Sequence, residues 1–220
     1  MPNLKLTLLA LLLATSAIAQ SNQQGLSPAA LWEMGRLSDE QLSPDGKTLL
    51  MGITYYDLAE NKGNRDLYTM PVEGGNPVKL TDTPEGEYNA RWRPDGQKIG
   101  YLSAKSGDMQ LWEVNPDGKG AVQVTNVTGG IGNFDYSPKG NYISFTREVA
   151  VGSDPAGEYR DLDKADFKII DDLMYRHWDS WSDKLYSHVH YMAYQNGAVQ
   201  GEPVDLMPSE PFDAPLKPFG

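Results

Sequence analysis

The sequence contains no cysteine among its 220 residues. This absence excludes a disulfide framework, a cysteine-ligated zinc site, an iron–sulfur cluster and thiol catalysis. Basic residues are also scarce, since 19 Lys and Arg stand against 30 Asp and Glu and leave a formal net charge of -11. A general nucleic-acid binder needs a basic stripe on its surface, so we expect no nucleic-acid partner.

Long apolar runs are absent except near the N-terminus. Residues 6–13 are apolar apart from Thr7, Lys5 precedes them, and residues 17–19 (AIA) form a small-x-small cleavage site. This pattern predicts a signal peptide over residues 1–19, with the mature protein starting near Gln20. Because the run is too short to span a bilayer, we expect an exported protein, periplasmic or secreted, with no membrane span after cleavage.

One turn motif repeats along the chain. LSPDGK at residues 42–47, WRPDGQK at 92–98 and YSPKGN at 136–141 each precede an apolar stretch. In such a turn Pro presets φ, Asp accepts hydrogen bonds from the main chain that follows, and Gly takes the positive φ that closes the turn. Each motif therefore predicts a tight turn between two antiparallel strands.

Two further markers keep the same phase as the turns. DLYTM at 66–70 matches QLWEV at 110–114, and VKLT at 78–81 matches VQVT at 122–125. One unit of about 45 residues then holds four short strands, which we expect to be half-buried because apolar and polar residues alternate along them. Such a unit is typical of a β-propeller blade, whereas a β-sandwich, the alternative, has no reason to repeat one turn in phase.

We therefore predict an all-β fold, a partial β-propeller with about four blades over residues 20–220. Residues 162–178 interrupt its strand pattern. Apolar residues recur there at helical spacing from Phe167 to Trp178, and Asp163 could cap their start. This pattern predicts a short helix inserted into the third or fourth blade.

The turns and the LY and LW strands resemble the propeller blades of the prolyl oligopeptidase family of serine peptidases and of TolB-like periplasmic propellers. LSPAALWEMGRL at 26–37 is similar to the start of that family's first blade. DDLMYRHWDSW at 171–181, the most specific element, is similar to a segment of secreted bacterial dipeptidyl peptidases and acylaminoacyl-peptidase-like members. DLMP at 205–208 and the following PFD resemble the next blade junction.

The resemblance implies a serine-type dipeptidyl peptidase, a hydrolase whose C-terminal α/β-hydrolase domain carries the Ser, Asp and His triad. No G-x-S-x-G nucleophile motif occurs in these residues. We therefore expect a truncated chain that lacks the hydrolase domain, has no catalytic residue and is inert alone. Its expected partners are peptide substrates and that hydrolase domain, a homodimer of the full protein is left open, and no cofactor is expected.

The resemblance also implies a substrate-binding site in the 171–181 segment. Dipeptidyl peptidases of this family hold the free α-amino group of the substrate with propeller carboxylates, so Asp171 and then Asp172 are the candidates. Arg176 could bind a substrate carbonyl, and Trp178 and Trp181 could wall the pocket. The alternative is that these residues pack against a neighbouring blade, with Asp172 and Arg176 as an exposed i, i+4 pair on the predicted helix.

Other functions stay open at this point. A non-enzymatic TolB-like periplasmic propeller would bind a protein partner, and a glycan-active propeller enzyme would need a carboxylate pair that the sequence does not single out. His188 and His190 lie two apart on a predicted strand and could join His177 on zinc, but we predict a polar exposed face and no metal site. GGIG at 129–132 is predicted to be a turn between blades.

Overall fold

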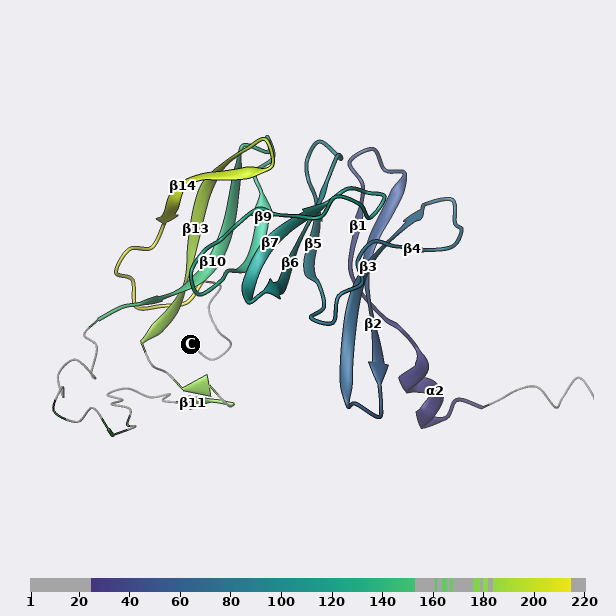
Figure 1. Ribbon diagram of the computed structural model, residues 1–220, viewed down its shortest axis with the longest axis horizontal. Coiled ribbons are helices and arrows are strands. Elements are labelled where there is room, and N and C mark those ends of the chain that lie inside the picture. Colours follow the sequence, from purple (N-terminus) through teal and green to yellow (C-terminus); the bar gives the residue numbers. More distant parts are fainter. Residues whose placement is uncertain are drawn as a thin grey trace, which may run out of the picture.

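The computed structural model describes residues 25–152, 161, 164–165, 167, 176–178, 180–181 and 184–214. These residues form three four-stranded antiparallel sheets, one two-stranded sheet and one short helix (Figure 1). The predicted signal peptide, residues 1–19, lies outside them. Within the ranges given, no helix combines the length and the apolar character that a membrane crossing requires.

The helix and the first sheet come first along the chain. Helix α2 spans Pro28–Glu33, and the Ser27 hydroxyl caps it by accepting a hydrogen bond from the N–H of Ala30. The first sheet has the order β1-β2-β3-β4. Its strands are β1 (Arg36–Leu42), β2 (Thr48–Asp57), β3 (Lys62–Pro71) and β4 (Val78–Lys79).

The second and third sheets repeat this meander. The second consists of β5 (Tyr88–Trp92), β6 (Ile99–Ser106), β7 (Asp108–Val114) and β8 (Val122–Gln123). The third consists of β9 (Gly132–Tyr136), β10 (Tyr142–Ala150), β13 (Leu185–Gln195) and β14 (Ala198–Asp205). Residues 151–184 are inserted between β10 and β13, and they contain the paired short strands β11 (Arg176–His177) and β12 (Ser180–Trp181).

The all-β fold and its four-stranded units are confirmed, while two details differ. The described residues hold three such units rather than about four, because the third sheet is interrupted by the long insertion between its second and third strands. The predicted helix over 162–178 is wrong at its end, where residues 176–177 form a strand. A turn at Trp178, with φ of +50°, reverses the chain there; most of the other residues of that helix, Asp163 included, lie outside the described part.

The three repeated turns share one set of hydrogen bonds. In each, the residue before Pro donates its N–H to the carbonyl five residues later, and Gly donates its N–H back to the carbonyl of that first residue, at 2.7–2.9 Å. Gly46, Gly96 and Gly140 have φ of +71°, +70° and +64°, which is a region that glycine adopts without strain. The predicted turn between blades at Gly129 and Gly130 is also a turn.

The VKLT and VQVT markers place two threonines in equivalent positions. The Oγ1 atom of Thr81 accepts a hydrogen bond from the N–H of Leu67, and that of Thr125 accepts one from the N–H of Leu111, both at 2.9 Å. Each threonine follows the two-residue fourth strand of its sheet. Its hydroxyl pairs with the N–H of a residue in the third strand. Because both threonines are buried, a residue without this oxygen would leave that N–H unpaired.

A fourth repeated feature was not predicted from the sequence. Asp39, Asn89 and Asn133 each lie five residues before the proline of a repeated turn, and they have φ of 55°, 50° and 37°. Each occurs at a register irregularity in the first strand of its sheet. Asp and Asn tolerate this left-handed conformation better than other side chains do. The Nδ2 atom of Asn89 also donates to the carbonyl of Phe134 at 3.1 Å, which links the second sheet to the third.

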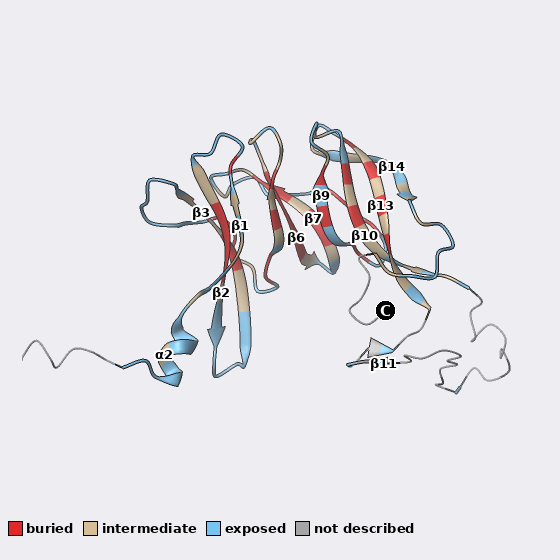
Figure 2. Cartoon of the chain, turned by 180° about the vertical axis from the view of Figure 1, so that it is seen from behind, coloured by how far each residue is buried: buried red, intermediate tan, exposed pale blue. Residues whose placement is uncertain are grey.

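Apolar side chains pack between neighbouring sheets, and Figure 2 shows buried residues concentrated in their strands. The first and second sheets enclose Leu50, Leu67, Leu80, Ala90, Trp92, Ile99, Tyr101 and Val114. The second and third enclose Leu102, Leu111, Val124, Val127, Ile131, Phe134, Tyr136, Ile143, Phe145, Met192 and Tyr194. Residues 99–103 of β6 are therefore all buried, so the expectation of half-buried strands is wrong here, because sheets cover both faces of the middle one.

Candidate functional site

The predicted site segment forms a hairpin where it is described. Arg176 of β11 lies opposite Trp181 of β12, and the guanidinium carbon is 5.4 Å from the centre of the Trp181 ring system, a cation–π arrangement. Trp178 occupies the turn between the two strands and is 85% exposed. The structure therefore brings together Arg176 and Trp181 and presents Trp178 to solvent beside them.

Asp171 and Asp172 lie outside the described residues, so their role stays a prediction. The predicted i, i+4 pairing of Asp172 with Arg176 required a helix that continues to residue 176. Arg176 is instead part of a strand, and its described contact is with Trp181.

The hairpin lies at the end of the sheets opposite the three repeated turns (Figure 1). Helix α2 and the connection between β2 and β3 lie at this same end. Trp32 of α2 packs edge-on against Tyr56 of β2 with 5.3 Å between ring centres, although they are 45% and 40% exposed. Helix α2 and the hairpin thus lie at the same end of the structure, on opposite sides of it in Figure 1.

The two histidines of β13 are buried, which corrects the prediction of an exposed polar face. His188 is 0% and His190 is 3% exposed, because their face of β13 is covered by the neighbouring core and by the chain that follows β14. His190 stacks on Phe145 with 5.8 Å between ring centres. In His188, Nδ1 lies 2.9 Å from Oδ2 of Asp205 and Nε2 lies 2.9 Å from the carbonyl oxygen of Glu210.

Asp205 anchors this cluster as an anion. Burial acts to raise the pKa of its carboxyl group, but the hydrogen bonds with His188 and with the N–H of Met207 outweigh burial and hold the pKa below its usual value. The N–H of Ala214 also donates to the carbonyl of Ser187 at 2.7 Å, so the segment after β14 is tied to β13. Among the residues that the structure describes, no group of His, Asp and Glu side chains is arranged to hold a metal ion.

A buried carboxylate that sequence reasoning missed joins the second and third sheets. Glu113 of β7 is 0% exposed and accepts hydrogen bonds from the hydroxyl groups of Tyr136, at 2.7 Å, and Tyr194. Nη1 of Arg93, in the repeated turn of the second sheet, lies 3.3 Å from the other carboxylate oxygen. Burial, and then the charge of Glu113, raise the pKa of Tyr136 well above its usual value, so its hydroxyl stays a donor.

A second buried carboxylate joins the first and second sheets. Glu87 precedes β5, is 0% exposed, and accepts hydrogen bonds from the hydroxyl groups of Thr81, at 2.6 Å, and Thr83. Its N–H donates to the carbonyl of Arg65 at 2.9 Å. Burial raises the pKa of Glu87, although the two hydroxyl donors act in the opposite direction. Glu87 and Glu113 thus hold neighbouring sheets in place.

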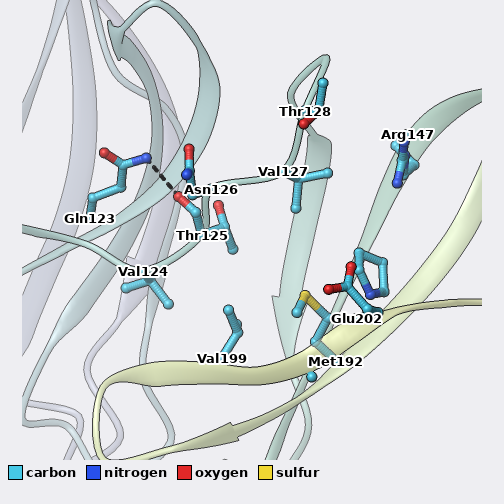
Figure 3. Close-up of a pocket in the computed structure, with 12 residues that line it drawn as sticks. Gln123, Val124, Thr125, Asn126, Val127, Thr128, Arg147, Met192, Val199 and Glu202 are labelled. Carbon is cyan, nitrogen blue, oxygen red and sulfur yellow. Dashed lines mark hydrogen bonds between the residues drawn. The ribbon is translucent and has the colours of Figure 1, made fainter.

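A cleft of about 620 Å³ opens between the second and third sheets (Figure 3). It is lined by residues 123–128 on one side and by side chains of β10, β13 and β14 on the other. Of the predicted site residues, the three that the structure describes, Arg176, Trp178 and Trp181, are not part of this lining.

The chain is 36% identical over 205 residues to Dipeptidyl-peptidase 5 of Porphyromonas gingivalis and 34% identical over 205 residues to Dipeptidyl-peptidase 5 of Porphyromonas endodontalis. These matches cover 93% of this chain but 30% and 29% of the two relatives, so the chain spans less than a third of their length. No protein-family model matches the chain.

Among solved structures, the acylaminoacyl peptidase of Pyrococcus horikoshii matches with a TM-score of 0.58 at 16% identity, over 80% of this chain and 26% of that one. A likeness at this identity shows the fold, and the three consecutive four-stranded sheets are blades of a β-propeller. Over its length the chain resembles the β-propeller portion of a prolyl oligopeptidase-family peptidase.

Proposed function

We propose that the full protein is an exported serine peptidase that releases dipeptides from the amino ends of peptides, and that this chain is its propeller portion. The observation that carries the proposal is the 36% identity to Dipeptidyl-peptidase 5 of P. gingivalis over 93% of this chain. The reaction itself, attack by a serine with a histidine as general base, is assigned to a hydrolase domain of the full protein. The propeller limits access to that domain and holds the amino end of the substrate.

In this proposal the inserted segment of the third sheet binds the substrate's amino end. Asp171 and Asp172 receive the α-ammonium group, because a charged group that loses water needs a charged acceptor. Arg176 binds a substrate carbonyl, and Trp181 fixes the guanidinium by the contact at 5.4 Å. Fixing the amino end at a set distance from the nucleophile would limit the released product to two residues.

The test uses the full-length gene product and chromogenic dipeptide substrates with free or acetylated amino ends. Substrates with a free amino end should be cleaved, while acetylation should lower kcat/KM by about 100-fold, since it removes a charged hydrogen-bonding partner. Asp171→Asn and Asp172→Asn should weaken only the free-amine substrates. Glu148→Gln, an exposed carboxylate on β10, is the matched control and should leave both rates unchanged.

Three outcomes separate the parts of the proposal. Equal cleavage of free and acetylated substrates would contradict anchoring of the amino end. Failure of a fluorophosphonate probe to label the active protein would contradict the serine mechanism. No hydrolysis of any peptide would favour the alternative, a non-enzymatic propeller that binds a protein partner. Export is tested by sequencing the N-terminus of the mature protein, which should begin near Gln20.

A further inference from the structure

The cleft between the second and third sheets takes no part in the proposed peptidase reaction. One wall is β8 with the residues that follow it to 128, and the other is formed by β10, β13 and β14 (Figure 3). Both flanking sheets have their four strands, so the cleft is bounded by described residues on both sides. Its volume of about 620 Å³ suits a small organic ligand, since such sites measure roughly 300–1,000 Å³.

One cation in this cleft forms no ion pair with the residues that the structure describes. Arg147 of β10 is partly buried and lines the cleft, and it makes no hydrogen bond or ion pair with the residues that the structure describes. Its neighbour across the strand pair is His188, and the nearby carboxylate of Asp205 is already engaged by His188 and Met207. A partly desolvated guanidinium without a partner favours binding of an anion, and a carboxylate matches its planar geometry.

The other side chains that line the cleft restrict the chemistry of a ligand whose carboxylate binds Arg147. Apolar side chains form the floor, namely Val124, Val127, Met192 and Val199. Glu202 of β14 places a second, negative group on the same wall as Arg147 (Figure 3). A ligand that satisfies both charged groups is itself a zwitterion with an apolar body.

We propose that this cleft binds short peptides with a free ammonium and a free carboxylate group. Arg147 binds the carboxylate, Glu202 binds the ammonium, and the ligand's apolar side chains cover the floor. An extended strand added to the edge of β14 is a poorer occupant, because Pro203 has no N–H to offer to it.

The test measures binding to the full-length protein by calorimetry and localises it by hydrogen–deuterium exchange. The probe is the dipeptide valyl-leucine, compared with its N-acetylated form, its C-terminal amide and inorganic phosphate. Valyl-leucine should slow exchange in residues 122–128 and 198–205. Each capped form should bind about tenfold more weakly, since each loses one charged hydrogen-bonding partner.

Two variants test which residue binds which end of the ligand. Arg147→Gln should remove the tenfold preference for the free carboxylate, and Glu202→Gln should remove the preference for the free amine. Glu148→Gln, which lies next to Arg147 but faces the other side of β10, should change neither. The proposal is overturned if valyl-leucine gives no protection in these two segments, if both capped forms protect them equally well, or if phosphate alone does so. The comparison of ligands on the unaltered protein decides the question even where a variant fails to fold.

Discussion

The hydroxyl group of Tyr136 in the third sheet donates a 2.7 Å hydrogen bond to the carboxylate of Glu113 in the second. Both side chains are buried, and the same carboxylate oxygen accepts a second bond from Tyr194. The boundary between these sheets is therefore held by a charge as well as by apolar packing. Arg93, in the turn between β5 and β6, lies 3.3 Å from the other oxygen, so the charge is paired within the second sheet.

Loss of that charge should destabilise the fold. Glu113→Gln removes the charge that the hydroxyl groups of Tyr136 and Tyr194 donate to, while Arg93 keeps its ion pair with Asp95. The substitution is expected to lower the free energy of unfolding by about 2 kcal/mol. Urea unfolding followed by tryptophan fluorescence measures this, with the exposed Glu148→Gln as control. An effect no larger than that of the control would contradict a stabilising role for the buried pair.

Gly100 is required by the position of Tyr136. A Cβ atom at residue 100 would overlap the Tyr136 hydroxyl and touch the ring of Phe134. Gly100→Ala should therefore cost about 2 kcal/mol through overpacking, whereas Gly25→Ala, whose Cβ would meet nothing, should be neutral. In a Tyr136→Phe background the cost of Gly100→Ala should fall, because the overlapping oxygen is gone. A double-mutant cycle with purely additive effects would contradict this explanation.

Glu87 should make stability depend on pH in a defined direction. Burial raises its pKa in the folded state, so the stability it contributes is complete below its unfolded pKa and is lost as pH rises through the folded value. From about pH 4 upward the unaltered protein should lose free energy of unfolding relative to Glu87→Gln. Glu85→Gln, an exposed neighbour, should follow the unaltered protein throughout. Parallel curves for all three proteins would contradict the assignment.

Thr125 should matter for its oxygen more than for its shape. Thr125→Val keeps the volume but leaves the N–H of Leu111 unpaired and removes a donor to Gln110, which should cost about 2 kcal/mol. Thr128→Val, three residues later at an exposed position, should cost less than about 0.5 kcal/mol. Thermal unfolding of both variants compares them. Equal melting temperatures would show that the repeated threonine has no such role.

The parts of the fold that local chemistry determines could be predicted from the sequence. The turns at Pro44, Pro94 and Pro138 form because Pro fixes φ and Gly readily adopts the positive φ that closes the turn, and the strands beside them follow in phase. The burial of His188 and of residues 99–103 of β6 could not be predicted, since it depends on which sheet covers which face. That covering is set by contacts between residues far apart along the chain.

The secondary structure around the candidate site was predicted less well than that of the sheets. Arg176 and Trp181 lie opposite each other through strand pairing, a contact that the predicted helix over 162–178 did not include. The apolar spacing from Phe167 to Trp178 was a weak guide, because a short segment with aromatic residues suits a hairpin as readily as a helix. Asp39, Asn89 and Asn133, which have left-handed backbone conformations, could have been found by their fixed distance from proline. No residue beside them indicates a register irregularity.

The pairing of β10 with β13 has a consequence for how this protein can vary in evolution. Nine residue pairs, from Tyr142 with Ala193 to Ala150 with Leu185, hold the two ends of the inserted residues 151–184 side by side. Once the ends are held, doubling the length of the connection adds only about 0.6 kcal/mol of closure entropy. Residues 151–184 can therefore lengthen, shorten or exchange their chemistry while the blade keeps its register, which makes this site open to evolutionary change in recognition.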